Sequence, residues 1–131
     1  MTAGVARNEA RVSVAPGPLV GPVLSRVVGM LAARAHCPVD RLDDALLIAD
    51  AIAAAAPEHS GDKRLVVDVV AVDAGLEIAV RELAQGGGDA LMASAALPGV
   101  GNVLERIASD VRVENDDHGP ESLVVRLDFE A

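Results

Sequence analysis

One carboxylate interrupts the most apolar stretch of the sequence. Arg41–Ala56 repeats apolar residues at the three- and four-residue spacing of a helical face, and after Asp44 it is apolar on nearly every side except at Asp50. Burying a lone carboxylate costs roughly several kcal/mol unless it is paired or reaches water. Asp50 therefore faces either a polar cavity, together with Ala54 one helical turn later, or solvent at the edge of the helix. The residues alone leave both interpretations open.

A second carboxylate stands at the end of a predicted strand. Arg64–Val72 and Leu76–Leu83 alternate as paired strands do, and the short polar stretch between them is typical of a hairpin turn. In the second strand, Glu82 falls on the same face as the apolar residues Leu76, Ile78 and Val80. This alternation predicts Glu82 at the end of the core-facing row and Leu83 on the opposite face. The alternative is that Glu82 is a strand-end residue exposed by fraying.

Two glycine-rich segments could bring backbone N–H groups close to an anion such as phosphate. Gly86–Gly88 is a run of three glycines, and Gly99-Val100-Gly101 precedes a predicted helix. The residues alone favour a plain hinge for the first segment, and short glycine patterns like the second recur by chance. Because Gln85–Ala96 combines glycines with small residues, we predict that it is the most mobile internal segment.

The rest of the chain predicts the elements that would position these residues. Periodicity predicts further helices at Leu19–His36 and Asn102–Ser109, and strands at Arg11–Ala15, Val111–Glu114 and Leu123–Phe129, the last two joined by the turn Asn115–Gly119. Because hairpins join neighbouring strands, this order predicts an α+β fold. We expect a two-layer α/β sandwich whose sheet is mixed but mostly antiparallel, with the helices on one face. Residues 1–10 are predicted to be a disordered lead-in to a single domain, residues 11–131.

Composition narrows the classes of partner. The chain has 131 residues, a net charge of −9, one Phe and no Trp or Tyr. Excess negative charge and the lack of stacking rings argue against nucleic acid and against an anionic membrane surface. The only cysteine is Cys37 and the three histidines lack ligand spacing, so neither a disulfide within the chain nor a metal site is expected. This composition fits a reducing cytoplasm, and no apolar run reaches the ~18 residues of a membrane helix.

Three stretches of the sequence, taken together with the predicted order of helices and strands, resemble the motifs of a known family. They are DRLDDALLIADAIAAAAPEH on the central helix, VRELAQGG at the end of the second hairpin strand, and GVGNVLERIASDV along the later helix. Together they resemble the histidine-kinase-like ATPase superfamily (the GHKL or Bergerat fold). The most similar branch is the RsbW-type anti-sigma factor serine kinases of bacteria. The resemblance runs from Arg11 to Phe129 and implies the sandwich architecture of that superfamily.

The resemblance assigns roles to individual positions. Asp50 stands where the family has a glutamate taken as the general base, and Ala54 where it has an asparagine that holds magnesium. Glu82 stands at the aspartate that accepts a hydrogen bond from the adenine amino group. Ala84 and Gly86 stand at the two glycines that follow this aspartate.

The second glycine box of the family is matched by Gly99 and Gly101, with Asn102 in place of an apolar residue. Magnesium strongly prefers oxygen ligands, and Ala54 offers none. The resemblance therefore implies a degenerate site at which ATP or ADP with magnesium binds weakly or no longer binds. Asp50 remains the candidate catalytic residue.

Three functions follow from these expectations. The first is a cytoplasmic regulatory protein of anti-sigma-factor type, which acts by binding a sigma factor or an anti-sigma-factor antagonist. The second is an active ATP-dependent serine/threonine kinase of such an antagonist, which would use Asp50 as its base. The third is a non-catalytic homodimeric scaffold that keeps only the fold.

Overall fold

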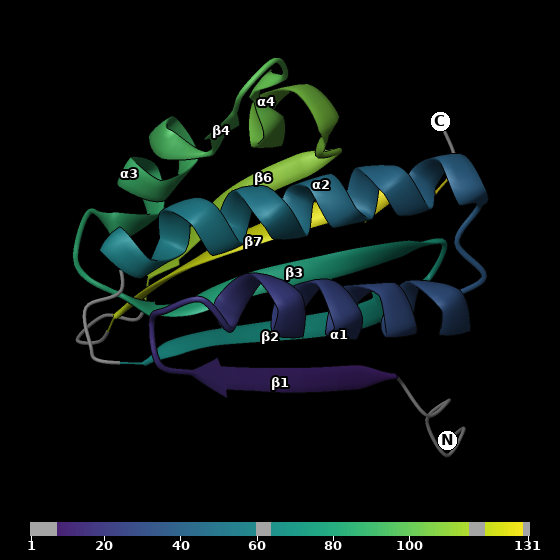
Figure 1. Cartoon of the computed structure of the whole chain (residues 1–131), viewed down its shortest axis with the longest axis horizontal. Coiled ribbons are helices and arrows are strands. Elements are labelled where there is room, and N and C mark those ends of the chain that lie inside the picture. The colour runs from purple at the N-terminus through teal and green to yellow at the C-terminus, as the bar shows by residue number, and fades with distance from the viewer. Residues whose placement is uncertain (1–7, 60–63, 116–119, 130–131) are drawn as a thin grey trace.

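A five-stranded sheet and four α-helices make up most of the part of the chain that the structure describes (Figure 1). The computed structural model describes residues 8–59, 64–115 and 120–129. The elements are, in chain order, β1 (Glu9–Val14), α1 (Val20–Arg34), α2 (Val39–Ala55), the single 3₁₀ turn η1 (Ala56–Glu58), β2 (Leu65–Val72), β3 (Gly75–Leu83), α3 (Gly87–Ser94), β4 (Ala96–Leu97), β5 (Gly101–Asn102), α4 (Val103–Ile107), β6 (Asp110–Asn115) and β7 (Glu121–Asp128).

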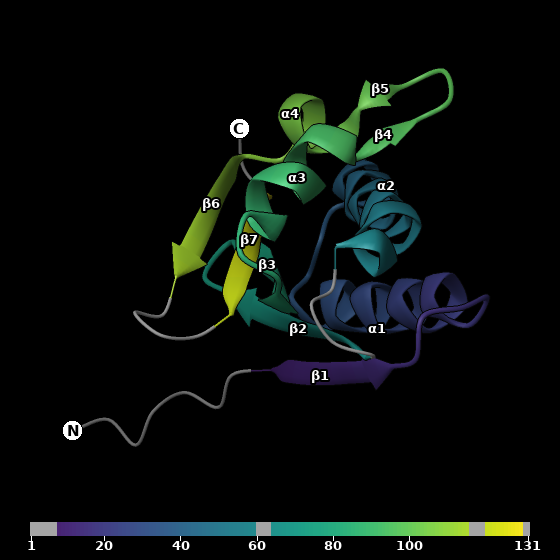
Figure 2. The ribbon, with the colours of Figure 1, turned by 90° about the vertical axis from the view of Figure 1, so that its left-hand side faces the viewer.

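The main sheet is antiparallel throughout the described pairings. Its strand order is β1-β2-β3-β7-β6, and the two-residue strands β4 and β5 pair separately. Figure 2 shows the helices on one side of this sheet, with the other side left open. The predicted α+β class, with a mostly antiparallel sheet and helices on one face, is therefore confirmed.

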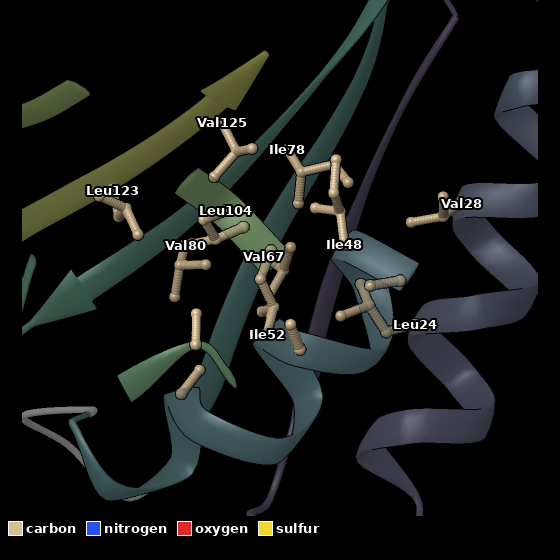
Figure 3. Packing of buried hydrophobic residues seen from close by; sticks show 14 of the residues in the cluster. Leu24, Val28, Ile48, Ile52, Val67, Ile78, Val80, Leu104, Leu123 and Val125 are labelled. Carbon is tan, nitrogen blue, oxygen red and sulfur yellow. The ribbon is translucent and has the colours of Figure 1, made fainter. Parts of the chain in front are cut away.

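The hydrophobic core lies between the sheet and the helices. Alternate residues of the central strands point into it because successive side chains of a strand face opposite ways. Figure 3 shows Leu24 of α1 and Ile48 and Ile52 of α2 directed toward the sheet residues Val67, Ile78 and Val80. All of these side chains are at most 2% exposed. Burial of this apolar surface is what fixes α1 and α2 on the sheet.

The buried face of α2 differs in part from the one that the helical spacing of the sequence predicts. That spacing predicts a core-facing stripe of Leu42, Ala45, Leu46, Ala49, Ile52, Ala53 and Ala56. Ala45, Ala49, Ile52 and Ala56 are buried as predicted, whereas Leu42, Leu46 and Ala53 are only half-buried. Ile48, Ala51 and Ala55, which lie outside the predicted stripe, are buried as well. An apolar run on nearly every side does not define one stripe, so the packing of α1 and α4 against α2 selects the face.

Of the two interpretations of Glu82, the core-facing one was wrong, and the exposure that the other expected is observed, although Glu82 lies within β3 and not in a frayed end. Between the pairs Val80–Leu123 and Leu83–Glu121, β3 advances by one residue more than β7. This β-bulge shifts the alternation by one position, and one position moves every later side chain to the other face. Leu83 is therefore fully buried and Glu82 is exposed, with a backbone φ of 57°.

Several predicted segments differ at their ends or lie outside the described residues. Glu9 and Ala10, expected in the lead-in, already belong to β1 and pair with β2. The lead-in residues 1–7 are not described, and neither are residues 116–119 of the predicted turn after β6. The predicted helices over 19–36 and 102–109 are observed with shorter bounds as α1 and α4.

Candidate functional site

Asp50 lies at a helix edge. Its side chain is exposed on α2, and its Oδ1 accepts a hydrogen bond of 3.2 Å from the Oγ of Ser25 on α1. Ala54, one turn later on the same helix, is exposed as well. The sequence left two interpretations of Asp50 open, a polar cavity or solvent at the edge of the helix. The observed geometry fits the second, because the carboxylate reaches water.

Glu82 lies on the open face of the sheet. It lines a hollow of about 450 Å³ together with the side chains of Arg11, Val66, Arg81, Glu114, Pro120 and Ser122. The helices pack on the other face, so the sheet separates Glu82 from α2 and from Asp50 (Figure 2). The structure thus does not bring the two predicted carboxylates together.

Ala84 and Gly86 meet at a second hollow, between the end of α2 and the start of α3. This hollow has a volume of about 230 Å³ and is also lined by Glu58, His59, Gln85, Gly87 and Ala90. At its edge, the Nε2 of His59 lies 2.9 Å from the Oγ of Ser94, which also donates to the carbonyl oxygen of Ala90. The Ser94 hydroxyl thus lies within hydrogen-bond distance of both the imidazole and a backbone carbonyl, and the tautomer of His59 decides which partner of the His59–Ser94 pair donates.

Gly99 lies in the turn between β4 and β5, and Gly101 is the first residue of β5, in a hairpin that is separate from the second hollow (Figure 2). Both have positive φ angles, 79° and 83°, which explains why glycine occupies them. Asn102, which follows, caps α4 by accepting a hydrogen bond of 3.1 Å from the N–H of Glu105. Its Nδ2 donates to the carbonyl oxygen of Met92 at 2.8 Å. The roles of these residues are structural in this geometry.

The run Gly86–Gly88 is not a plain hinge, as the sequence suggested, but begins helix α3. Gly86 is the N-cap residue with a φ of 81°, and Gly87 and Gly88 are buried in the first turn. A Cβ atom on Gly88 would lie 2.9 Å from both methyl groups of Val113 on β6, which is too close for any other residue. Close packing thus requires glycine at this position.

Glu121 is a further candidate for a functional residue, and the sequence patterns did not predict it. It is the first residue of β7 and is 9% exposed, and among the described residues it is the one buried charged side chain. Its two carboxylate oxygens accept hydrogen bonds from the backbone N–H groups of Gly86, at 2.8 Å, and Gly88, at 3.0 Å. These bonds hold the pKa of the Glu121 carboxyl below its ordinary value. One signal was available, because Glu121 is in phase with the inward row Leu123, Val125 and Leu127.

The contact between the Glu121 carboxylate and the first turn of α3 is electrostatically favourable. The N-terminus of a helix carries free N–H groups and a partial positive charge, which favour an anion. Here Glu121 supplies that anion from within the chain. Four apolar side chains of α3, α4 and the segment between them are at most 1% exposed: Leu91, Ala95, Val103 and Leu104. They belong to the same core cluster as Val80 and Val67, and Figure 3 labels Leu104, Val80 and Val67.

Comparison with known proteins adds no assignment. No model of a known protein family matches the chain, and none of the curated proteins is similar to it in sequence. Within residues 8–59, 64–115 and 120–129, no cluster of three or more His, Cys, Asp or Glu side chains could hold a metal ion. In the same part of the chain, every helix is too short or too polar to cross a membrane.

Proposed function

We propose that this chain is a regulatory protein of anti-sigma-factor type that acts by binding another protein and does not turn over ATP. One observation carries the proposal. The backbone N–H groups of Gly86 and Gly88 are hydrogen-bonded to the chain's own Glu121 carboxylate. Gly86 is a position that the family resemblance assigns to the nucleotide-binding glycines. A phosphate could use these donors only by displacing a charge-assisted pair of hydrogen bonds.

Two further features support a role without phosphoryl transfer. The candidate base, Asp50, and the candidate adenine-binding residue, Glu82, lie on opposite sides of the sheet. Ala54 offers no oxygen to magnesium, and the helix has no Lys or Arg after Arg41 to offset phosphate charge. A triphosphate would therefore enter a protein of net charge −9 without a built-in counter-charge at this helix.

The proposed partner is a sigma factor or an anti-sigma-factor antagonist protein. The net charge of −9 favours the approach of a partner with a basic contact surface over an acidic one. A cytoplasmic location and a homodimer are part of the same proposal, and both come from the family resemblance and the composition.

Titration calorimetry with ATP and with ADP, each with and without magnesium, tests the absence of nucleotide chemistry. We expect no saturable heat with the natural chain and no phosphate transfer to an antagonist protein. The matched variant is Ala54→Asn, which adds the missing oxygen at an exposed helix position. Tight ATP binding with turnover by the natural chain would overturn the proposal in favour of an active kinase.

Binding to purified sigma factors and antagonist proteins of the same genome tests the regulatory role. We expect one of them to form a stable complex whose strength falls with added salt, because charge attraction contributes to association. A chain that binds none of these proteins and forms only a dimer would support a scaffold instead.

A further inference from the structure

Helix α3 is held to the rest of the molecule by few contacts. It has eight residues, and only Leu91 among its large side chains is fully buried. Met92 is partly buried against the core, and Gly88 packs against Val113. The polar attachments of the later part of the helix are the pair of Ser94 with His59, the Met92 carbonyl with Asn102, and the Ala95 carbonyl, just after the helix, with the N–H of Val103. An isolated helix of this length does not form in water, and two glycines in its first turn weaken it further. Its stability must therefore come from its attachments.

The attachment that involves a charge is at its N-terminus. Glu121 reaches α3 from β7, an inner strand of the sheet, and its carboxylate accepts hydrogen bonds from the N–H groups of both Gly86 and Gly88. The carboxylate oxygen at Gly88 lies in a buried position, so neither partner can exchange this bond for water without moving the helix. The N-cap residue itself supplies no side-chain cap, because it is a glycine. Glu121 thus takes the place of the capping side chain.

We infer that Glu121 is a latch. Its carboxylate, seated on the first turn of α3, keeps this helix closed over the core, and loss of that charge releases α3 while the sheet stays folded. Release uncovers Leu91 and Ala95, both fully buried in the closed state, together with the part of α2 that α3 contacts. The inference does not rest on the proposed function, since it concerns the opening of one helix and not a partner or a nucleotide.

Hydrogen exchange of the full chain, resolved by residue, tests the latch in the variant Glu121→Ala. We expect the amides of α3 to exchange roughly tenfold faster or more, whereas those of β2 and β3 stay within about twofold of the natural chain. The control is Glu105→Ala, which removes an exposed carboxylate from the first turn of α4. It should leave exchange in α3 unchanged.

Chemical rescue separates a latch from ordinary packing. Formate added to the Glu121→Ala variant can occupy the space of the missing carboxylate and accept the same N–H groups, so it should restore slow exchange in α3. Chloride at equal ionic strength should not. Equal acceleration in all strands, or no acceleration in α3, would overturn the inference, and so would a failure of formate to restore protection. If Glu121→Ala does not fold, Glu121→Gln serves in its place: it keeps the shape, loses the charge, and should accelerate exchange in α3 alone.

Discussion

The side chains on the two faces of the main sheet make different kinds of contact. On the covered face, Val67, Ile78 and Val125 are at most 2% exposed and belong to the hydrophobic core between the sheet and the helices. On the open face, alternate residues of the same strands form a chain of ion pairs. Its members are Arg11, Asp68, Glu77, Arg81, Asp110, Arg112, Glu114, Arg126 and Asp128.

The two faces of the sheet contribute to stability through different interactions. Apolar burial contributes free energy in proportion to the area removed from water, whereas exposed ion pairs contribute about 0–1 kcal/mol each. The charged side chains still have a packing role on the open face. Ala79 and Val124 there are only 4% and 2% exposed, and they lie opposite Asp68 and Arg112 in the strand register. Long charged side chains cover apolar surface with their stems while the charged group stays in water. We therefore expect the covered face to determine stability and the open face to modulate it.

The largest effect should come from the covered face. Ile52→Ala should lower the free energy of unfolding by about 2–5 kcal/mol, because the lost side chain is fully buried and leaves a cavity. Leu46→Ala, on the same helix but half-buried, is the control and should cost less. Urea unfolding of both variants measures the difference. Equal losses would mean that the two positions are equally buried in solution.

A smaller effect is expected at the centre of the open face. Asp68 accepts hydrogen bonds from Arg11, at 2.7 and 2.9 Å, and from Arg81, at 3.1 Å. Asp68→Asn should cost about 1 kcal/mol at neutral pH, since the side chain is partly screened by solvent. Arg11→Gln, which removes one partner and keeps Arg81, should cost no more than this.

The effect of Asp68→Asn should also depend on pH. The hydrogen bonds from Arg11, with further help from Arg81, hold the pKa of the Asp68 carboxyl below its ordinary value. A lowered folded-state pKa stabilises the fold above the unfolded value of about 3.9, and this contribution is lost as pH falls through the folded-state value. The difference between the natural chain and Asp68→Asn should therefore shrink in acid below about pH 4. Thermal unfolding across pH measures it, and a constant difference would contradict the ion-pair explanation.

The smallest effect should be at Glu82, the residue that the bulge moves from one face to the other. Glu82→Gln should change the free energy of unfolding by less than about 0.5 kcal/mol, as is usual for exposed side chains. Had the alternation continued to the end of β3, Glu82 would be buried among apolar neighbours and removal of its charge would stabilise the protein. A clear gain in stability would thus contradict the bulge.

Periodicity along the chain determined much of this fold. The alternation of β2, β3 and β7 and the helical spacing of α1 and α2 are local properties, so the α+β class, the hairpins and the antiparallel sheet could be predicted from the sequence. The capping role of Asn102 before α4 can also be predicted from the local sequence, because an N-cap residue bonds only to its own helix.

Contacts between distant segments were decided by the tertiary structure alone. The buried face of α2 depends on which neighbours pack against it, since the sequence of that helix is apolar nearly all round. The bulge that exposes Glu82 depends on how β3 pairs with β7. The bonds from Gly86 and Gly88 to Glu121 join residues 35 and 33 positions apart. No local pattern fixes which carboxylate meets which N–H group across such distances, because that choice is made by strand register and side-chain packing together.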